Sequence, residues 1–292
     1  MGRGRVKRRV VQSEDGWAVV THGMGGLEVG RRRGGEGGEG DESDQEIGNP
    51  KDKGKDKDKG KVVTGMPNII NDLTTTTLLA DFKTRTNRWR DTACAVHLRG
   101  LLDAKEWLDV GEAVCVGIGS FSRDWEHRFR SLWQLVVFVE VVGMLQKQGL
   151  DVKVYAQDPA FTPVDISFLS SLDIQVKDPG IQSHISTRTF VYSPFVDWYL
   201  LLPTFLQTRD PELYIGNEIL DDYTAYAQTE DKRNKLDECN QLGRRFLDSR
   251  DVARLEDFEL HAHALNGLVV YWKKQQEDND EAELKTEDDA PS

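Results

Sequence analysis

Residues 113–121 have the sequence Ala-Val-Cys-Val-Gly-Ile-Gly-Ser-Phe, a short apolar run whose two glycines are one residue apart. The run is too brief for a helix, and an uninterrupted apolar stretch of this length is typical of a strand buried on both faces of a parallel sheet. Glycines at the carboxyl end of such a strand permit a tight turn or a close approach of backbone. We therefore predict that residues 113–118 form a central strand and that the rest of the domain packs around it.

Predicted strands and helices alternate after this run. The strands are expected at 152–156, 174–176, 189–192, 213–215 and 264–272, and the helices at 131–148, 164–172, 195–206 and 229–249. Before the run, apolar residues at helical spacing predict one or two helices between Pro67 and Leu108, with Asn71 or Asp72 as the N-cap. Alternation of this kind predicts right-handed βαβ units. The expected fold is a Rossmann-like three-layer α/β/α sandwich with a mostly parallel sheet, preceded by one or two helices.

The composition divides the chain into three regions. Residues 1–65 hold 16 of the 26 glycines and blocks of charged residues, so we predict a disordered, basic and glycine-rich region there. Residues 66–272 form the predicted α/β domain, and residues 273–292 form an acidic tail that is also expected to be disordered. Two short segments of the first region have distinct sequence features. Arg3–Arg9 is a basic segment that either binds nuclear import factors or nucleic acid or is simply solvated, and Gly16–Val20 is an apolar patch suited to a short docking strand.

Charge and cysteine content exclude several classes of protein. The net charge of −12 makes nucleic acid an unfavourable partner, except through the basic segment Arg3–Arg9. The three cysteines are odd in number and lack metal-binding spacing, which fits a reducing compartment. The longest apolar run, Leu135–Val142, is much shorter than the ~20 residues of a membrane span, and the N-terminus lacks the apolar core of a secretory signal. We expect an intracellular protein that does not associate with membranes.

A parallel sheet brings the carboxyl ends of its strands to one edge, where ligands of open α/β sheets bind. The residues expected to face a shared crevice at that edge are Gly117, Gly119, Ser120, Asp158, Ser193 and Asn217. Two close glycines and an acid after the second strand are typical of nucleotide-binding folds, and methyltransferases that use S-adenosylmethionine share this layout. However, Ser122 stands where a third glycine belongs, and Asp158 follows Gly119 by 39 residues rather than the usual ~20. Two interpretations therefore remain, a cradle for a nucleotide-type ligand or a tight strand exit followed by an Asp-Pro turn.

Other polar residues indicate a functional site less strongly. Arg123, Arg128 and Arg130 surround His127 just before the predicted helix 131–148, and this loop could hold a phosphate or carboxylate or be a solvated helix start. His261 and His263 have no third ligand nearby, so we expect no metal site. The chain has no Gly-x-Ser-x-Gly elbow and no cysteine with a recognisable histidine partner, which argues against a nucleophilic hydrolase. We predict no catalytic residue and assign no cofactor.

Several short motifs together resemble a known family. They are Trp89-Arg-Asp91 with Cys94, Cys115-Val-Gly-Ile-Gly119, Trp133-Gln-Leu135, Asp158-Pro-Ala-Phe161, Tyr192-Ser-Pro-Phe195, Ile215-Gly-Asn217 and Leu265-Asn266. Their order and spacing, from Trp89 to Trp272, resemble the SRR-like domain, named for the plant gene "sensitivity to red light reduced". The basic start of the chain suits a fungal or other eukaryotic member. Leu265-Asn266-Gly267 departs from the Phe-Asn-Asp that members tend to carry, so a role for that acid does not transfer.

The resemblance implies a regulatory role rather than a reaction. Plant members act in light signalling and the circadian clock, animal members are linked to haem biosynthesis and clock-gene expression, and a yeast member to microtubule-related processes. Members are cytoplasmic and nuclear, and the family has no established catalytic residues to carry over. The leading hypothesis is a regulator with protein partners and an undefined molecular activity. The alternative is an enzyme or sensor that binds a nucleotide or S-adenosylmethionine at the strand-end crevice. Haem binding, a third possibility, has no ligand signature in the sequence.

Overall fold

The computed structural model describes residues 8–12, 18–22, 66–107, 109–123 and 128–274, and the chain divides into two compact units, Met1–Met66 and Pro67–Ser292. In the first unit, β1 (Arg8–Gln12) pairs with β2 (Ala18–His22) as an antiparallel ladder. This pair lies within the region predicted to be disordered, and β2 includes three residues of the apolar patch. The rest of that region, most of the basic segment Arg3–Arg9 and the acidic tail lie outside the described residues. The predicted domain limits therefore stay a prediction.

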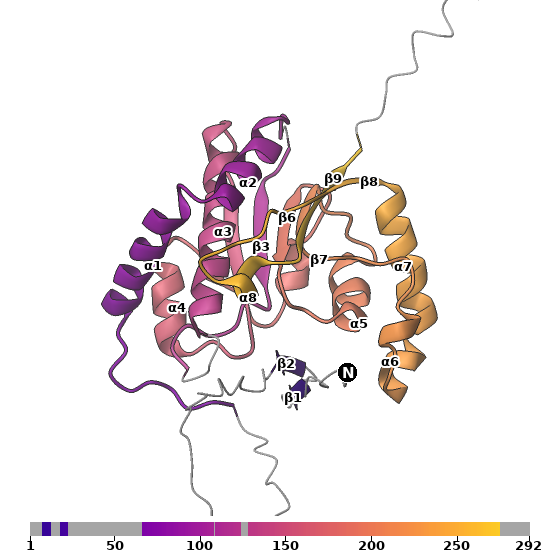
Figure 1. Cartoon of the computed structure of the whole chain (residues 1–292), viewed down its shortest axis with the longest axis horizontal. Coiled ribbons are helices and arrows are strands. Elements are labelled where there is room, and N and C mark those ends of the chain that lie inside the picture. The colour runs from indigo at the N-terminus through magenta and orange to yellow at the C-terminus, as the bar shows by residue number, and fades with distance from the viewer. Residues whose placement is uncertain (1–7, 13–17, 23–65, 108, 124–127, 275–292) are drawn as a thin grey trace, which may run out of the picture. The chain divides into compact units, whose positions relative to one another are not determined.

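The second unit is built on one seven-stranded sheet with the order β5-β4-β3-β6-β7-β9-β8 (Figure 1). Its strands are β3 (Glu112–Val116), β4 (Lys153–Gln157), β5 (Gln175–Val176), β6 (Thr189–Ser193), β7 (Leu213–Asn217), β8 (Arg250–Arg254) and β9 (Leu268–Lys273). The strands from β3 to β7 are parallel, and β9 runs antiparallel to both of its neighbours. Four residues of β3 and all of β6 are buried, as the apolar runs predict for central parallel strands. The predicted central strand is confirmed.

Helices cover both faces of the sheet, with α1 to α4 on one side and α5 to α7 on the other (Figure 1). The helices are α1 (Thr75–Trp89), α2 (Ala93–Asp103), α3 (Arg128–Lys147), α4 (Pro163–Ser170), α5 (Trp198–Leu200), α6 (Glu230–Asn234), α7 (Leu236–Asp248) and α8 (Ala262–Leu265). A π-helical turn (Leu201–Leu206) continues α5, and short 3₁₀ turns occupy Ile181–His184 and Thr224–Tyr226. The predicted Rossmann-like three-layer α/β/α sandwich, preceded by two helices, is confirmed.

The helix α3 is long and apolar enough, by length and composition, to cross a membrane. However, 67% of this stretch is buried inside the domain, where its side chains pack against the sheet and against α1, α2 and α8. Burial of most of its length is typical of the core helix of an α/β domain. The apolar character of α3 is therefore accounted for by packing.

Several boundaries differ from those expected. The N-cap of α1 is Thr74 rather than Asn71 or Asp72, because Thr74 Oγ1 accepts a hydrogen bond from the amide of Thr77. The helix expected at 195–206 begins only at Trp198, since Asp197 still has extended backbone angles. The helix expected at 229–249 is divided at Lys235, whose φ of −101° and ψ of −1° separate α6 from α7.

The end of the domain differs most from the prediction. Ala264 and Leu265, expected in the closing strand, belong to α8, and β9 begins only after Gly267 turns the chain at a φ of +87°. The edge strand β8 was not predicted. Its residues Arg-Asp-Val-Ala-Arg alternate between more and less exposed positions, which is the pattern of a strand covered on one face only.

Candidate functional site

Asp158 lies at the carboxyl end of β4 and binds the backbone beside it. Its Oδ2 accepts a hydrogen bond of 2.7 Å from the amide of Gly119, and its Oδ1 accepts one of 2.8 Å from the amide of Ala160. The carboxyl group is buried, with only 7% of the residue exposed. The sequence correctly predicts that Gly119 and Asp158 meet at the sheet edge, but they meet by bonding to each other.

Burial raises the pKa of Asp158 to about 6, against the lowering effect of its two amide donors and of the Arg123 guanidinium. Arg123 is itself committed to the backbone, because its Nε donates to the carbonyl of Ala160 and its terminal nitrogen to the carbonyl of Pro67, each at 2.8 Å. Of the three arginines in the predicted anion-binding loop, Arg123 thus has a structural role. His127 of that loop lies outside the described residues.

A second acid, Asp165, organises the turn after β3. Fully buried in the first turn of α4, it accepts hydrogen bonds from Ser120 Oγ at 2.6 Å, the Phe121 amide at 3.1 Å and the Thr162 amide at 2.9 Å. Thr162 Oγ1 in turn accepts a hydrogen bond from the Asp165 amide, which completes a capping box. Asp165 was not among the site residues predicted from the sequence, although Thr162-Pro-Val-Asp165 has the capping-box spacing with proline at the first helical position.

Side chains cover the carboxyl edge of the sheet next to β3 and β4. The Phe121 ring stacks on Phe161 with 5.9 Å between ring centres and contacts the edge of Phe168 at 5.2 Å. Gly117 has a φ of +74°, and a Cβ atom there would lie 2.4 Å from Cγ2 of Val196. The loop after β6 therefore packs directly on the exit of β3, and Gly117 is required both for the backbone angle and for the contact. The edge between β3 and β4 is filled by the chain itself.

The other two predicted residues lie at the ends of β6 and β7. Ser193 is buried, and its Oγ has no hydrogen-bond partner within the described part of the chain. Asn217 lines a cavity of about 200 Å³ together with Val196, Asp197, Trp198, Leu201, Glu218, Leu220, Tyr223 and Tyr226. The rings of Trp198 and Tyr223 stack with their centres 4.7 Å apart and their planes 15° from parallel. The six predicted residues thus share one edge but divide into a filled half and an open half.

The filled half, the cavity and the helices around them all fall within residues 76–272, and these residues match the sequence profile of the SRR1 domain. The chain belongs to the SRR1 domain family. This confirms the resemblance drawn from the sequence motifs between Trp89 and Trp272. No curated protein matches the chain.

The cysteines of this SRR1 domain are poor nucleophiles. Cys94, Cys115 and Cys239 are free and buried. Burial raises the pKa of Cys94 to about 12 and that of Cys239 to about 11, and it raises the pKa of Cys115 well above the ordinary value. Thiols in this state stay protonated at neutral pH, so they act here as small apolar side chains.

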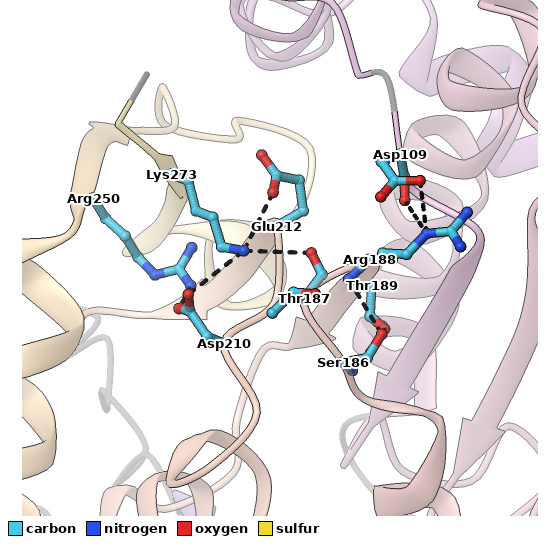
Figure 2. A network of polar contacts seen from close by, with 9 residues as sticks. All are labelled: Asp109, Ser186, Thr187, Arg188, Thr189, Asp210, Glu212, Arg250 and Lys273. Carbon is cyan, nitrogen blue, oxygen red and sulfur yellow. Dashed lines mark hydrogen bonds and ion pairs between the residues drawn. The ribbon is translucent and has the colours of Figure 1, made fainter. Parts of the chain in front are cut away.

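The opposite, amino edge of the SRR1 domain sheet carries an ionic network (Figure 2). The Lys273 ammonium lies 3.5 Å from carboxylate oxygens of both Asp210 and Glu212, and the buried Arg250 guanidinium pairs with Asp210. Arg188 and Asp109 form a separate, exposed pair with an N–O distance of 2.7 Å. The Lys273 and Arg250 contacts join the starts of β7 and β8 to the end of β9, and the Arg188–Asp109 pair joins the start of β6 to the segment before β3, so these contacts stabilise the fold.

We expect Asp158 to make the SRR1 domain less stable as the pH rises from about 4 to about 6. Between the ordinary pKa of 3.8 and the raised value of about 6, the unfolded chain has lost the proton that the folded chain keeps. Stability that is fully present below pH 4 is therefore lost as the pH passes 6, by about 3 kcal/mol for a shift of this size.

The measurement is urea unfolding of the wild type and of Asp158→Ala at pH 4 and at pH 7. The difference in unfolding free energy between the two proteins should be about 3 kcal/mol smaller at pH 7 than at pH 4. The unfolding free energy of Asp158→Asn should depend on pH in the same way as that of Asp158→Ala, because both variants lack the titrating carboxyl group. A difference that stays constant with pH would contradict the raised pKa.

Proposed function

We propose that this SRR1 domain protein is a regulator that acts by binding protein partners rather than by turning over a substrate. Its proposed setting is the cytoplasm and nucleus, in circadian or light signalling and in the regulation of haem biosynthesis. The observation that carries the proposal is the filled edge between β3 and β4. An enzyme that used this edge would need free amides after β3 and a free carboxylate after β4, whereas Asp158 and the Gly119 amide are bonded to each other.

The second acid supports the same conclusion. Both carboxylate oxygens of Asp165 accept hydrogen bonds from donors of the chain itself. One of these donors, Ser120 Oγ, lies in the same buried network. Groups satisfied in this way hold a turn rigid, and disengaging them to bind a ligand would leave buried donors unpaired at a cost of roughly 1–3 kcal/mol each. A rigid, self-satisfied edge supports a scaffold that presents its surface to partners.

The test uses two variants at the strand ends that should leave the fold intact. Ser193→Ala removes a hydroxyl that has no hydrogen-bond partner among the described residues, and Asn217→Ala removes an amide from the cavity. In a host whose own copy is deleted, both variants should restore haem content and rhythmic gene expression as fully as the wild type. Turnover of a small substrate by the purified chain, abolished by Asp158→Ala or by either variant, would overturn the proposal.

The cavity beside Asn217 favours a second function, binding of a small aromatic ligand such as S-adenosylmethionine or a nucleoside. The stacked Trp198 and Tyr223 offer an aromatic wall next to an amide, a combination suited to a base. Asp197 and Glu218 also line the cavity, and carboxylates disfavour phosphate groups. S-adenosylmethionine, whose sulfonium is positively charged, is therefore a better fit than a nucleotide.

Titration calorimetry with S-adenosylmethionine, adenosine and ATP separates these ligands. If the second function holds, S-adenosylmethionine binds the wild type, ATP binds less tightly, and Trp198→Ala lowers the affinity at least tenfold. Gly100→Ala, on the exposed side of α2 with open space around it, serves as the control. Absence of binding at millimolar ligand would exclude the cavity as a site for this class.

A further inference from the structure

Four arginines and two histidines gather where α1, the start of α3 and α8 meet, at the carboxyl edge of the sheet. This arginine–histidine cluster consists of Arg85, Arg88, Arg128, Arg130, His261 and His263. The guanidinium carbons of Arg85 and Arg128 lie 4.6 Å and 4.5 Å from the centre of the same Phe129 ring. Those of Arg85 and Arg88 each lie 5.9 Å from the Trp133 ring centre. His261 is close enough to Arg85, Arg130 and His263 for all three to lower its pKa, in addition to the larger effect of burial.

The cluster carries far more positive than negative charge. Of the carboxylates in the described part of the chain, only Asp81 lies within ion-pair distance, 3.7 Å from both Arg85 and Arg128. Among the described residues, four guanidinium groups and one carboxylate at ion-pair distance leave an excess of three positive charges, before either histidine takes a proton. Such a local excess is unfavourable by itself, and it occurs in a chain whose net charge is −12.

Three nitrogen atoms of the cluster are buried without a hydrogen-bond partner among the described residues. They are Arg85 Nε, Arg130 Nε and His261 Nδ1, one each from α1, from α3 and from the residue before α8. Arg130 forms no ion pair within the described ranges, and burial lowers its pKa to about 10, which leaves it charged at neutral pH. Its guanidinium stacks on the Phe195 ring at 4.5 Å. Stacking occupies the face of a guanidinium and leaves its N–H edge free to donate.

We propose that the arginine–histidine cluster binds the phosphoryl group of a small phosphorylated molecule. A phosphomonoester carries close to two negative charges at neutral pH and several acceptor oxygens, which matches the charge excess and the unpartnered Nε groups of Arg85 and Arg130. The cluster also stands over the first turn of α3, a 20-residue helix whose positive end favours an anion. A carboxylate would neutralise only one charge, and a long polyanion would be repelled by the rest of the chain.

This site is separate from the residues behind the proposed function. It involves neither the Asp158 and Asp165 network nor the cavity beside Asn217, so its failure would leave the regulatory proposal untouched. The site extends the anion-binding loop that was predicted from the sequence. It includes, in addition, the arginines of α1 and the histidines at α8. Within that loop it retains Arg128 and Arg130 and leaves out Arg123.

The experiment is titration calorimetry of the full chain with inorganic phosphate at constant ionic strength, together with thermal unfolding. Phosphate should bind with saturation and raise the melting temperature of the wild type. Arg130→Gln should lower the affinity at least tenfold. This variant removes a guanidinium that has no paired acid among the described residues but stacks on Phe195, so its melting temperature without phosphate should fall only slightly. Arg188→Gln removes the same charge from the amino edge, where Arg188 is exposed (Figure 2), and should bind phosphate like the wild type.

Three results would overturn the proposal. Non-saturable binding at millimolar phosphate, or equal losses in Arg130→Gln and Arg188→Gln, would show that only general charge attraction is present. A phosphoserine peptide that binds at least tenfold more tightly than free phosphoserine would overturn the small-molecule assignment and identify a protein as the source of the phosphoryl group.

Discussion

Replacing Asp165 by alanine should cost the SRR1 domain about 4 kcal/mol of unfolding free energy, a large part of the 5–15 kcal/mol typical of a domain. The reason is that three donors lose one buried carboxylate, namely Ser120 Oγ, the Phe121 amide and the Thr162 amide. A hydrogen bond to a charged group contributes roughly 1.5–3 kcal/mol, and such losses within one network are not fully additive. Urea unfolding followed by circular dichroism measures the change.

The asparagine variant makes the test specific to hydrogen bonding. Asp165 Oδ2 accepts from both Ser120 Oγ and Thr162, whereas Oδ1 accepts only from Phe121. Asparagine can keep the first two bonds if its amide nitrogen faces Phe121, at a cost of about 2 kcal/mol for the remaining unpaired donor. Ser167→Ala, on the exposed side of the same helix, should change stability by no more than about 0.5 kcal/mol. A loss below about 1 kcal/mol for Asp165→Ala would show that the network does not hold the turn after β3.

The central strands could be predicted from the sequence because burial on both faces leaves a visible apolar run. Ala113–Val116 is such a run, and residues 190–192 form another between Thr189 and Ser193; both segments are fully buried. The edge strand β8 has no such signal, since only one face of Arg250–Arg254 is covered. Ala264 and Leu265 are ambiguous for a different reason. Two buried apolar residues before a glycine fit a helical turn or the start of a strand equally well.

The position of the candidate site could be predicted from the sequence, but the hydrogen bonds among its residues could not. Parallel topology places Gly119 and Asp158 at one edge, as expected, but only the folded structure shows that they satisfy each other. The cavity depends on Trp198 and Tyr223, which lie in different connections and follow no periodic pattern. The arginine–histidine cluster is likewise a product of packing, because Arg85 lies more than forty residues before Arg130 in the sequence. Contacts of this kind leave no local signature.

Replacing Phe258 by alanine should destabilise the domain by roughly 3–5 kcal/mol, the usual cost of removing a phenylalanine from a core. Phe258 is only 1% exposed, and its ring centre lies 5.6 Å from that of Trp89 and 4.9 Å from that of Trp133. Its amide also donates a 2.7 Å hydrogen bond to Asn266 Oδ1. The side chain therefore fastens the connection between β8 and α8 to both α1 and α3.

Two matched variants separate the contribution of the ring from that of the backbone bond. Phe258→Leu keeps an apolar side chain and should lose less than half as much stability as alanine, and Asn266→Ala should lose about 1 kcal/mol. Hydrogen exchange shows where the loss falls. Because Phe258 joins three elements, Phe258→Ala should accelerate exchange in α1 and α3 as well as in the connection itself. Faster exchange confined to residues 255–261, with an unchanged unfolding midpoint, would mean that this connection only lies against the core and contributes little to holding the two helices together.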